Sequence, residues 1–273
     1  MNDPFNLSGR VAVITGGAGL LGFQHASAIA SAGGTPVLVD IDAARAEAKA
    51  AEIGQQFGVP AAGFACDITQ PEKVSQLLDT VLARFGRVDI LINNAANNPR
   101  VEASAEVNFS RLENFPLAQW EADIAVGVTG AFLCCKTFGT HMAKSGGGVI
   151  LNVASDLAII GPDQRIYRQP GTAEHMQPVK PITYSVVKSA LIGLTRYLAT
   201  YWADKHVRVN AISPGGVANN QPEDFVERLT NLIPMGRMAN VDEYRGAILF
   251  LCSDASSYMT GANLVVDGGR TCW

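Results

Sequence analysis

Charged residues are scarce in this chain of 273 residues, and no block of them carries a single sign. Lys, Arg, Asp and Glu together make up 17% of the sequence, and the formal net charge is −4. Nucleic-acid binding needs clustered Lys and Arg side chains that neutralise phosphates, so the composition argues against a nucleic-acid partner. Hydrophobic residues make up 48% of the chain, which is enough for a large core and too much for a disordered protein.

Cysteine is also sparse, and its spacing shows no metal-binding or redox pattern. The five cysteines include no CxxC pair, so we expect reduced, buried thiols and no metal site. No stretch approaches ~18 uninterrupted apolar residues, the length that spans a bilayer. The first ten residues lack the basic-then-apolar order of a signal peptide. We therefore predict a cytoplasmic protein without a membrane span.

Short apolar runs alternate with amphipathic segments along the chain. The runs are nearly continuous, as in strands that are buried on both faces. This alternation predicts one Rossmann-type α/β domain over residues 1–273, a doubly wound parallel sheet of about seven strands with helices on both faces. We expect strands at residues 10–15, 36–40, 61–66, 88–92, 148–153, 207–212 and 263–266. We expect helices at residues 20–32, 43–57, 71–85, 120–143, 183–205 and 241–253.

A glycine-rich turn follows the first expected strand. Gly17, Gly19 and Gly22 form the pattern GxGxxG between that strand and the next helix. Glycine lets the backbone turn tightly and approach a pyrophosphate, which the free N–H groups of a helix N-terminus then bind. Asp40 follows 23 residues after Gly17, at the end of the second strand, where a carboxylate accepts hydrogen bonds from a ribose. We therefore predict a dinucleotide site.

Asp40 also bears on which dinucleotide is bound. Its carboxylate would accept hydrogen bonds from the ribose hydroxyls of NAD and would repel the 2′-phosphate of NADP. No Arg or Lys lies in the glycine turn or directly after Asp40 to offset that repulsion. The sequence therefore predicts NAD as the cofactor in preference to NADP.

Tyr184 and Lys188 form a candidate acid/base pair. They are four residues apart, so they share one face of the expected helix. A free phenol titrates near ~10, and a neighbouring ammonium favours the phenolate and lowers that pKa. Such a phenol can take the proton of an alcohol as hydride leaves, or return it in the reverse direction. The alternative is an ordinary surface Tyr and Lys on an amphipathic helix.

Three motifs together resemble the short-form branch of the short-chain dehydrogenase/reductase superfamily: Asn93-Asn94-Ala95-Ala96, Tyr184-x-x-x-Lys188 and Pro214-Gly215. The resemblance runs from Thr15-Gly16 to the closing VDGG at residues 266–269. It implies an oxidoreductase that interconverts a secondary alcohol and a ketone, with sugars, polyols and sugar derivatives as candidate substrates. It also implies a homotetramer or homodimer, with contacts through the closing strand and the last helices.

The resemblance further assigns roles to single residues. Ser155 would bind the substrate oxygen as charge develops on it, Tyr184 would transfer the proton, and Lys188 would hold the nicotinamide ribose. The residues it implies for cofactor binding are Gly16, Gly19, Leu20, Leu21, Gly22, Asp40, Ile41, Asp67, Ile68, Asn94, Ala95, Ala96, Tyr184, Lys188, Pro214, Gly215, Val217 and Asn219.

Three single positions depart from the family pattern. Leu20 stands where the short-form branch usually has glycine, which resembles the extended branch and keeps a nucleotide-sugar epimerase or dehydratase open as an alternative. Gly127 stands where the family usually has an Asn that helps hold a water beside the Lys. That change puts the usual proton relay in doubt and keeps a weakly catalytic NAD-binding regulator open. Asn219 replaces a Thr and can still donate to a carboxamide.

The fourth departure is a polar insertion at about residues 160–181. It separates Ser155 from Tyr184 by 29 positions, where the family has about a dozen intervening residues. We predict a substrate lid that favours an anionic or sugar-like ligand, because long loops in compact domains are often functional. The alternatives are a solvated loop and an oligomer contact. The substrate-binding candidates are Asp156, Arg165 and Arg168, and the insertion also carries Tyr167, His175 and Lys180. The insertion and the tail at 234–270 more weakly resemble bacterial oxidoreductases of surface-glycan and flagellin modification.

Overall fold

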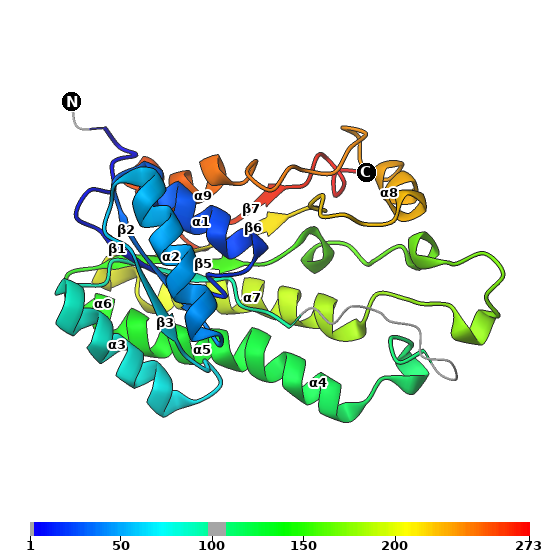
Figure 1. Cartoon of the computed structure of the whole chain (residues 1–273), viewed down its shortest axis with the longest axis horizontal. Helices are drawn as coiled ribbons and strands as arrows, with labels where there is room; N and C mark the ends of the chain where they lie inside the picture. The colour runs from blue at the N-terminus through cyan, green and yellow to red at the C-terminus, as the bar shows by residue number, and fades with distance from the viewer. Residues whose placement is uncertain (1–2, 98–107) are drawn as a thin grey trace.

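The computed structural model describes residues 3–97 and 108–273, and their strands form one sheet (Figure 1). All neighbouring strands are parallel, in the order β3-β2-β1-β4-β5-β6-β7, which confirms the predicted doubly wound architecture. The strands are β1 (Val11–Thr15), β2 (Thr35–Asp40), β3 (Ala62–Ala65), β4 (Ile90–Asn93), β5 (Gly148–Val153), β6 (Val207–Pro214) and β7 (Asn263–Val266).

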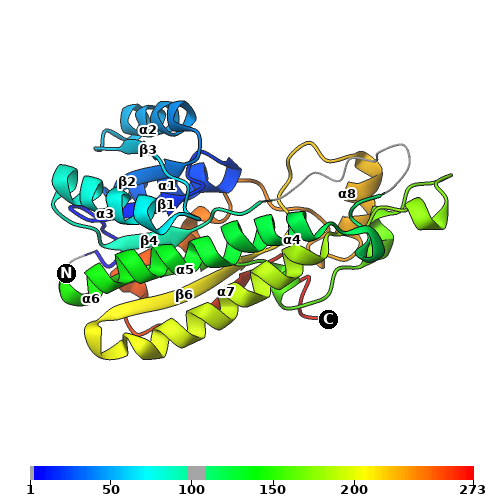
Figure 2. The ribbon, with the colours of Figure 1, turned by 90° about the horizontal axis from the view of Figure 1, so that it is seen from below.

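Helices cover both faces of this sheet. The helix at residues 117–144 and α7 lie side by side along one face, as Figure 2 shows. The helices are α1 (Leu20–Ser31), α2 (Ala43–Phe57), α3 (Pro71–Phe85), α4 (Leu117–Ile124), α5 (Ala131–Cys134), α6 (Thr140–Lys144), α7 (Ile182–Tyr201), α8 (Glu223–Thr230) and α9 (Arg245–Cys252). The segments α4, α5 and α6 belong to one continuous helix, joined by π-helical turns at Ala125–Gly130 and Cys135–Gly139.

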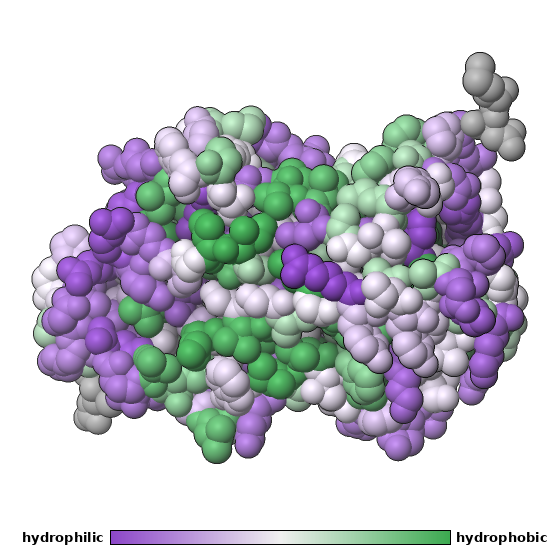
Figure 3. All heavy atoms as spheres, turned by 180° about the vertical axis from the view of Figure 1, so that it is seen from behind, coloured by the Kyte–Doolittle hydropathy of each residue, from purple (hydrophilic) through white to green (hydrophobic). Residues whose placement is uncertain are grey.

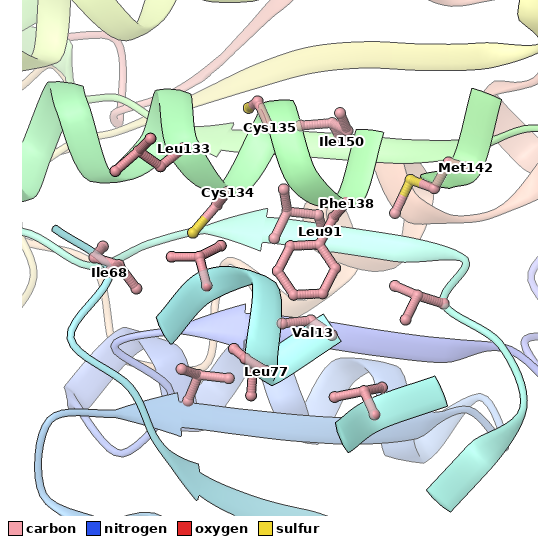
Figure 4. Close-up of a cluster of buried hydrophobic side chains, with 14 of the residues drawn as sticks. Val13, Ile68, Leu77, Leu91, Leu133, Cys134, Cys135, Phe138, Met142 and Ile150 are labelled. Carbon is pink, nitrogen blue, oxygen red and sulfur yellow. The ribbon is translucent and has the colours of Figure 1, made fainter. Parts of the chain in front are cut away.

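Each strand supplies side chains to two separate cores, which explains the continuous apolar runs. In β1, Val11 and Val13 face the layer of α3, α5 and α7, whereas Ala12 and Ile14 face the layer of α1, α2 and α9. Figure 4 shows the first of these cores, where Phe138 packs against Leu91.

The structure differs from the sequence-based expectation at two helices. Helix α8 was not predicted, because eight residues with a largely polar sequence give little periodic signal. The last helix begins at Arg245, whereas we expected residue 241, because turns occupy 241–244. The helix at 117–144 is long and apolar enough to cross a membrane by composition, yet half of its most apolar window is buried inside the protein, as in a core helix.

The sheet and its connections determine where a ligand can bind. β1 pairs with β2 on one side and with β4 on the other, so the strand order reverses beside β1. Ligands bind parallel sheets of this kind at the carboxyl ends of the strands, next to such a reversal. The 160–181 insertion and α8 lie together at the end of the molecule away from the N-terminus (Figure 1). The connections that follow β1, β4, β5 and β6 therefore carry the candidate site.

Candidate active site

The turn between β1 and α1 leaves the N-terminus of α1 uncovered by side chains. Gly16 adopts a φ of 60°, in the left-handed region that favours glycine. A Cβ at Gly22 would lie 2.1 Å from the Gly16 carbonyl oxygen, so only glycine lets the helix pack this closely on the turn. Gly19 caps α1 without a side-chain hydrogen bond, and no acidic residue lies in the first turn. The free N–H groups and the helix dipole thus form an anion-binding surface.

A first hollow, of about 300 Å³, extends from this turn over the ends of β2 and β3. The Asp40 carboxylate borders it and accepts hydrogen bonds from the backbone N–H of Ile41 at 2.9 Å and of Ala18 at 3.3 Å. Asp67 also borders it, and hydrogen bonds from Thr69 hold the pKa of that carboxyl below its usual value. Of the predicted cofactor residues, this hollow collects Gly16, Gly19, Asp40, Ile41, Asp67, Ile68, Asn94, Ala95 and Ala96.

Two asparagines at the end of β4 hold the central strands in register. The Asn94 side-chain amide donates to the carbonyl oxygens of Thr15 at 3.0 Å and Gly16 at 3.1 Å. The Asn93 amide donates to Asn152 Oδ1 at 2.8 Å, which ties β4 to β5. The glycine turn and the end of β5 therefore form a continuous rigid edge.

A second hollow, of about 410 Å³, adjoins the first and contains the candidate acid/base group. Tyr184 Oη donates to Ser155 Oγ at 3.4 Å, and Lys188 Nζ donates to the Val153 carbonyl oxygen at 2.7 Å. Asn94 and Ala96 line both hollows. Of the predicted residues, the second hollow collects Leu20, Leu21, Asn94, Ala96, Ser155, Asp156, Tyr184, Lys188, Pro214, Gly215, Val217 and Asn219.

The pKa of Tyr184 differs from the sequence-based expectation. Burial raises the pKa of the phenol, whereas we expected Lys188 to lower it. Lys188 is only 6% exposed, and burial lowers the pKa of its own ammonium to about 8. Its Nζ lies 5.9 Å from the Tyr184 ring centroid, while Lys180 Nζ lies 3.8 Å from the same centroid. The desolvation of the phenol therefore outweighs the Ser155 hydrogen bond and the Arg270 charge, which both lower its pKa.

A buried ion pair holds the carboxylate to which Ser155 donates a hydrogen bond. Ser155 Oγ donates to Asp156 Oδ1 at 2.7 Å, and Arg270 Nη1 donates to Asp156 Oδ2 at 2.7 Å. Asp156 is 3% exposed and Arg270 6% exposed. The role of Arg270 could not be predicted, because a lone arginine after the last strand gives no local signal of a partner 114 residues away.

The insertion is packed against α8 and shapes the outer wall of the second hollow. Ile166 is buried with Leu229 in a small apolar cluster, and the Tyr167 ring lies 5.5 Å from the ring of Phe225. Arg228 Nε donates to the Ile166 carbonyl oxygen at 2.8 Å. This first part of the insertion is therefore an ordered wall of the site, and Lys180 at its end also lines the hollow.

Two predicted substrate residues lie elsewhere on the insertion. Arg165 forms an ion pair with Asp163 at 2.6 Å, and its side chain is 81% exposed. Arg168 pairs with Glu174 at 3.0 Å and is also exposed. Neither arginine lines either of the two hollows, because each points to an acid within its own short segment.

Gly127 lies in the first π-helical turn, directly against α7. A Cβ at this position would lie 2.4 Å from Val187 Cγ1, so Val187 occupies the space that a larger side chain at 127 would need. Beside it is a hollow of about 10 Å³, lined by Lys188, Thr183 and Asp123, which is about the size of one water. Thr183 Oγ1 donates to Asp123 Oδ2 at 2.6 Å. Polar partners for a water beside Lys188 are thus present without an asparagine at 127.

Comparisons with known proteins agree with this geometry. Residues 10–167 match the family model described as short chain dehydrogenase, and residues 171–271 match one described as Enoyl-(Acyl carrier protein) reductase. The chain is 36% identical to a D-threitol dehydrogenase of Mycolicibacterium smegmatis, with 98% of this chain and 95% of that protein covered.

Two solved structures also resemble it closely. A gluconate 5-dehydrogenase from Burkholderia cenocepacia, in complex with NADP and tartrate, superposes with a TM-score of 0.84 at 29% identity, covering 99% of this chain and 98% of that one. An NAD+-bound xylitol dehydrogenase superposes with a TM-score of 0.82 at 28% identity, covering 98% of this chain and 100% of that one.

Proposed function

The chain belongs to the short-chain dehydrogenase family, a family of nicotinamide-dependent oxidoreductases that act on CH–OH groups, and we propose that it is an NAD-dependent dehydrogenase of a polyol or sugar. It would interconvert a secondary alcohol and a ketone. The observation that carries this proposal is the convergence of Tyr184, Ser155 and Lys188 in one hollow that adjoins an uncovered helix N-terminus.

The residues present fit a nicotinamide dinucleotide along both hollows. The glycine turn leaves room for a pyrophosphate at the N-terminus of α1, and Asp40 lies where it can accept hydrogen bonds from a ribose. The carboxylate of Asp40 supports NAD rather than NADP, because it would repel a 2′-phosphate. The relatives include proteins described with either cofactor, so the preference depends on Asp40. When bound, the nicotinamide ring accepts the hydride of the alcohol, or donates it in the reverse direction.

The side chains of the second hollow supply the proton chemistry. Ser155 Oγ donates to Asp156 and accepts from Tyr184, so it orients the phenol toward the hollow. As the alcohol loses its hydride, the phenolate form of Tyr184 takes the hydroxyl proton, and in ketone reduction the phenol returns it. Lys188 favours the phenolate through its charge and would contact the nicotinamide ribose. The expected proton route then leads past Thr183 and Asp123, through the small hollow beside Lys188.

A polyol or sugar substrate is supported by the relatives and by the lining of the hollow. The similar proteins are described as dehydrogenases of threitol, xylitol and gluconate, all of which carry several hydroxyl groups. Asn219 and Gln221 add amide groups to the lining, while Tyr167 and Phe225 form its aromatic wall. The amide groups can form hydrogen bonds with the hydroxyl groups of a carbohydrate, and the aromatic rings can pack against its C–H groups.

Measurement of nicotinamide reduction across a panel of alcohols tests this proposal. The purified protein is incubated with NAD+ and with tetritols, pentitols, hexitols and their oxidised derivatives, and the absorbance of NADH is followed. We expect net NADH formation with at least one of these compounds. Product formation without net NADH would instead support the epimerase alternative, and intact NADH binding without turnover of any compound would support the regulator.

We also propose a cytoplasmic homo-oligomer, a tetramer or dimer. Large apolar side chains are exposed at Ile182, Val186 and Tyr197 on α7 and at Val265 on β7. Figure 3 shows apolar patches on the face opposite to that of Figure 1. All five cysteines are free, as suits a reducing compartment; four are buried as expected, whereas Cys272 is exposed. Light scattering coupled to size-exclusion chromatography checks the assembly, and a monomer at micromolar concentration would contradict it.

A further inference from the structure

The second hollow carries more positive than negative charge next to the reacting groups. Among the described residues, its lining includes three cationic side chains, Lys180, Lys188 and Arg270, and one carboxylate, that of Asp156. An excess of buried or half-buried cations is costly unless an anion accompanies it. The hollow therefore offers a favourable place to a negatively charged group.

Asp156 does not compensate the remaining cations, because its oxygens are already bonded. Oδ1 accepts hydrogen bonds from Ser155 Oγ and from the Leu157 backbone N–H, both at distances below 3 Å. Oδ2 accepts the hydrogen bond of Arg270 at 2.7 Å. Asp156 and Arg270 thus form a neutral pair. Lys188 donates to a backbone carbonyl at the floor of the hollow, which leaves Lys180 as the cation that faces the substrate space.

Among residues 3–97 and 108–273, no acidic side chain pairs with Lys180, whose backbone is nevertheless held in place. Its backbone N–H donates to Gln164 Oε1 at 2.8 Å, and Pro181, the cap of α7, follows it directly. The ion pairs of this part of the structure are Arg165–Asp163, Arg168–Glu174 and Arg270–Asp156, and none involves Lys180. Burial accordingly lowers the pKa of the Lys180 ammonium to about 8, as expected for a desolvated cation whose charge is not matched.

The position of Lys180 relative to Tyr184 fixes where the anion would lie. Its Nζ is 3.8 Å from the centroid of the Tyr184 ring, so a group bound to it lies close to the phenol oxygen. Resting on the proposed function, we infer that the substrate is a sugar acid, a polyhydroxy carboxylate whose carboxylate lies one or two carbons from the reacting carbinol, and that Lys180 binds that carboxylate.

A carboxylate suits this hollow better than a phosphate ester does. A phosphate dianion is usually bound by more than one cation or by a bidentate arginine. Here the arginine of the hollow is already bonded to Asp156, and one lysine remains for the ligand. One ammonium matches the single charge of a carboxylate. A neutral polyol would leave that ammonium with the face of the Tyr184 ring and no counter-charge from the ligand, so the site discriminates against the uncharged analogue.

Matched pairs of substrates test the inference by turnover. We compare kcat/KM for threonate against threitol and for mannonate against mannitol, with NAD+ and the full-length protein. We expect the acid of at least one pair to be preferred by about tenfold or more. In Lys180→Met we expect the ratio of kcat/KM for the acid to kcat/KM for the neutral polyol to fall by about tenfold or more, chiefly because KM for the acid rises. In Lys180→Arg we expect this ratio to recover most of its wild-type value. Arg165→Met removes a cation from the exposed part of the same segment and serves as the matched control, with the ratio unchanged.

A binding measurement keeps the test independent of turnover. Calorimetric titration of the NADH-saturated protein with threonate, mannonate, threitol and erythritol 4-phosphate gives the dissociation constants directly. Tighter binding of a carboxylate, weakened by Lys180→Met and not by Arg165→Met, supports the inference. It is overturned by preference for the phosphate ester, by absence of carboxylate binding, or by equal loss for acid and neutral ligands in Lys180→Met. If one of these overturning results is found and neutral polyols are still oxidised, the carboxylate site is refuted and the proposed dehydrogenase function stands. If no alcohol is oxidised, the dehydrogenase function is refuted, and the binding data still decide on the carboxylate site.

Discussion

Arg270 and Asp156 form an ion pair inside the protein, with a distance of 2.7 Å between Nη1 and Oδ2. The pair joins the turn after β7 to the segment after β5, and it orients the acid to which Ser155 donates. Loss of one member would leave the other charge buried without its partner, which usually costs more than loss of an exposed pair.

This pair predicts a large stability effect for a single substitution. Arg270→Met should lower the free energy of unfolding by about 3–5 kcal/mol, because Asp156 then keeps a buried charge without its guanidinium. Urea denaturation followed by circular dichroism measures the change. Arg10→Met breaks the more exposed Arg10–Asp254 pair and should cost less than about 1 kcal/mol. Equal effects of the two substitutions would contradict the role assigned to Arg270.

Removal of the phenol oxygen tests the assignment of the acid/base group. Tyr184→Phe should lower kcat by about 10²–10⁴-fold, because no other described group is placed to exchange the proton with the substrate oxygen. NADH binding, measured by fluorescence, should stay within a few-fold of the wild-type value. Tyr197→Phe alters an exposed tyrosine of the same helix and should leave kcat unchanged. Wild-type turnover by Tyr184→Phe would exclude the mechanism proposed.

Asp40 should decide between the two dinucleotides. The wild-type protein should bind NADH more tightly than NADPH, and Asp40→Ala should weaken NADH binding by about 10–100-fold through loss of a charged hydrogen-bond acceptor. The same change should leave NADPH binding equal or stronger, because the repulsion of the 2′-phosphate is removed. Asp42→Ala is the control, since Asp42 caps α2 through Arg45 and should affect stability rather than the NADH-to-NADPH ratio. Tighter binding of NADPH by the wild-type protein would refute the role of Asp40.

The contact between Gly127 and Val187 predicts a coupled pair of substitutions. Gly127→Ala should destabilise the fold by about 1–3 kcal/mol, because its Cβ would lie 2.4 Å from Val187 Cγ1. Val187→Ala removes the clashing methyl groups, so the double variant should be more stable than the sum of the single changes predicts, by about 0.5–3 kcal/mol. Thermal or urea unfolding of the four proteins gives this coupling. Strictly additive effects would mean that the two positions do not share one space.

The pH dependence should differ between acidic and neutral substrates. Burial has lowered the pKa of Lys180 from its ordinary value of 10.5 to about 8, and the ammonium is the form that binds an anion. At pH values above about 8, KM for a sugar acid should therefore increase, by a factor that approaches ten per pH unit. KM for the neutral polyol should not increase in this way. Asp156 and Arg270 face the same hollow as a bonded ion pair. Lys188 and Tyr184 also face it, and because the proton transfer to or from either substrate depends on them, their titration should appear in kcat for both substrates. In Lys180→Met the difference between the two pH profiles should vanish; a persistent difference would assign it to another group.

The sequence predicted the elements whose signals are local and strong. The strands could be predicted from the apolar runs, because both faces of each strand are buried. The glycine turn, Asp40 and Tyr184 could be assigned to one site, because they follow the pattern of a parallel sheet that binds its ligand at the carboxyl ends of the strands. Helix α8 gave no comparable signal, since it is short and its one buried residue, Leu229, packs in a small cluster with the distant Ile166.

The remaining part of the site depends on contacts between distant segments. Arg165, Arg168 and Lys180 are all cationic in the sequence, yet in the fold Lys180 lies over the Tyr184 ring while the two arginines pair with nearby acids. The pKa of Tyr184 could not be predicted either, because it reflects how deeply the phenol is buried rather than the spacing of Tyr184 and Lys188.

The insertion also has a consequence for how this enzyme could change. It leaves the sheet after β5 and returns at the start of α7, and the strand pairing of β5 with β4 and β6 fixes its departure point. Tyr184 and Lys188 lie on α7, beyond its return, so replacing about twenty residues need not move the reacting groups. Exchange of this one segment could therefore change the substrate specificity. A directed-evolution library restricted to residues 160–181 would vary the substrate preference and leave the residues of the catalytic scaffold unchanged.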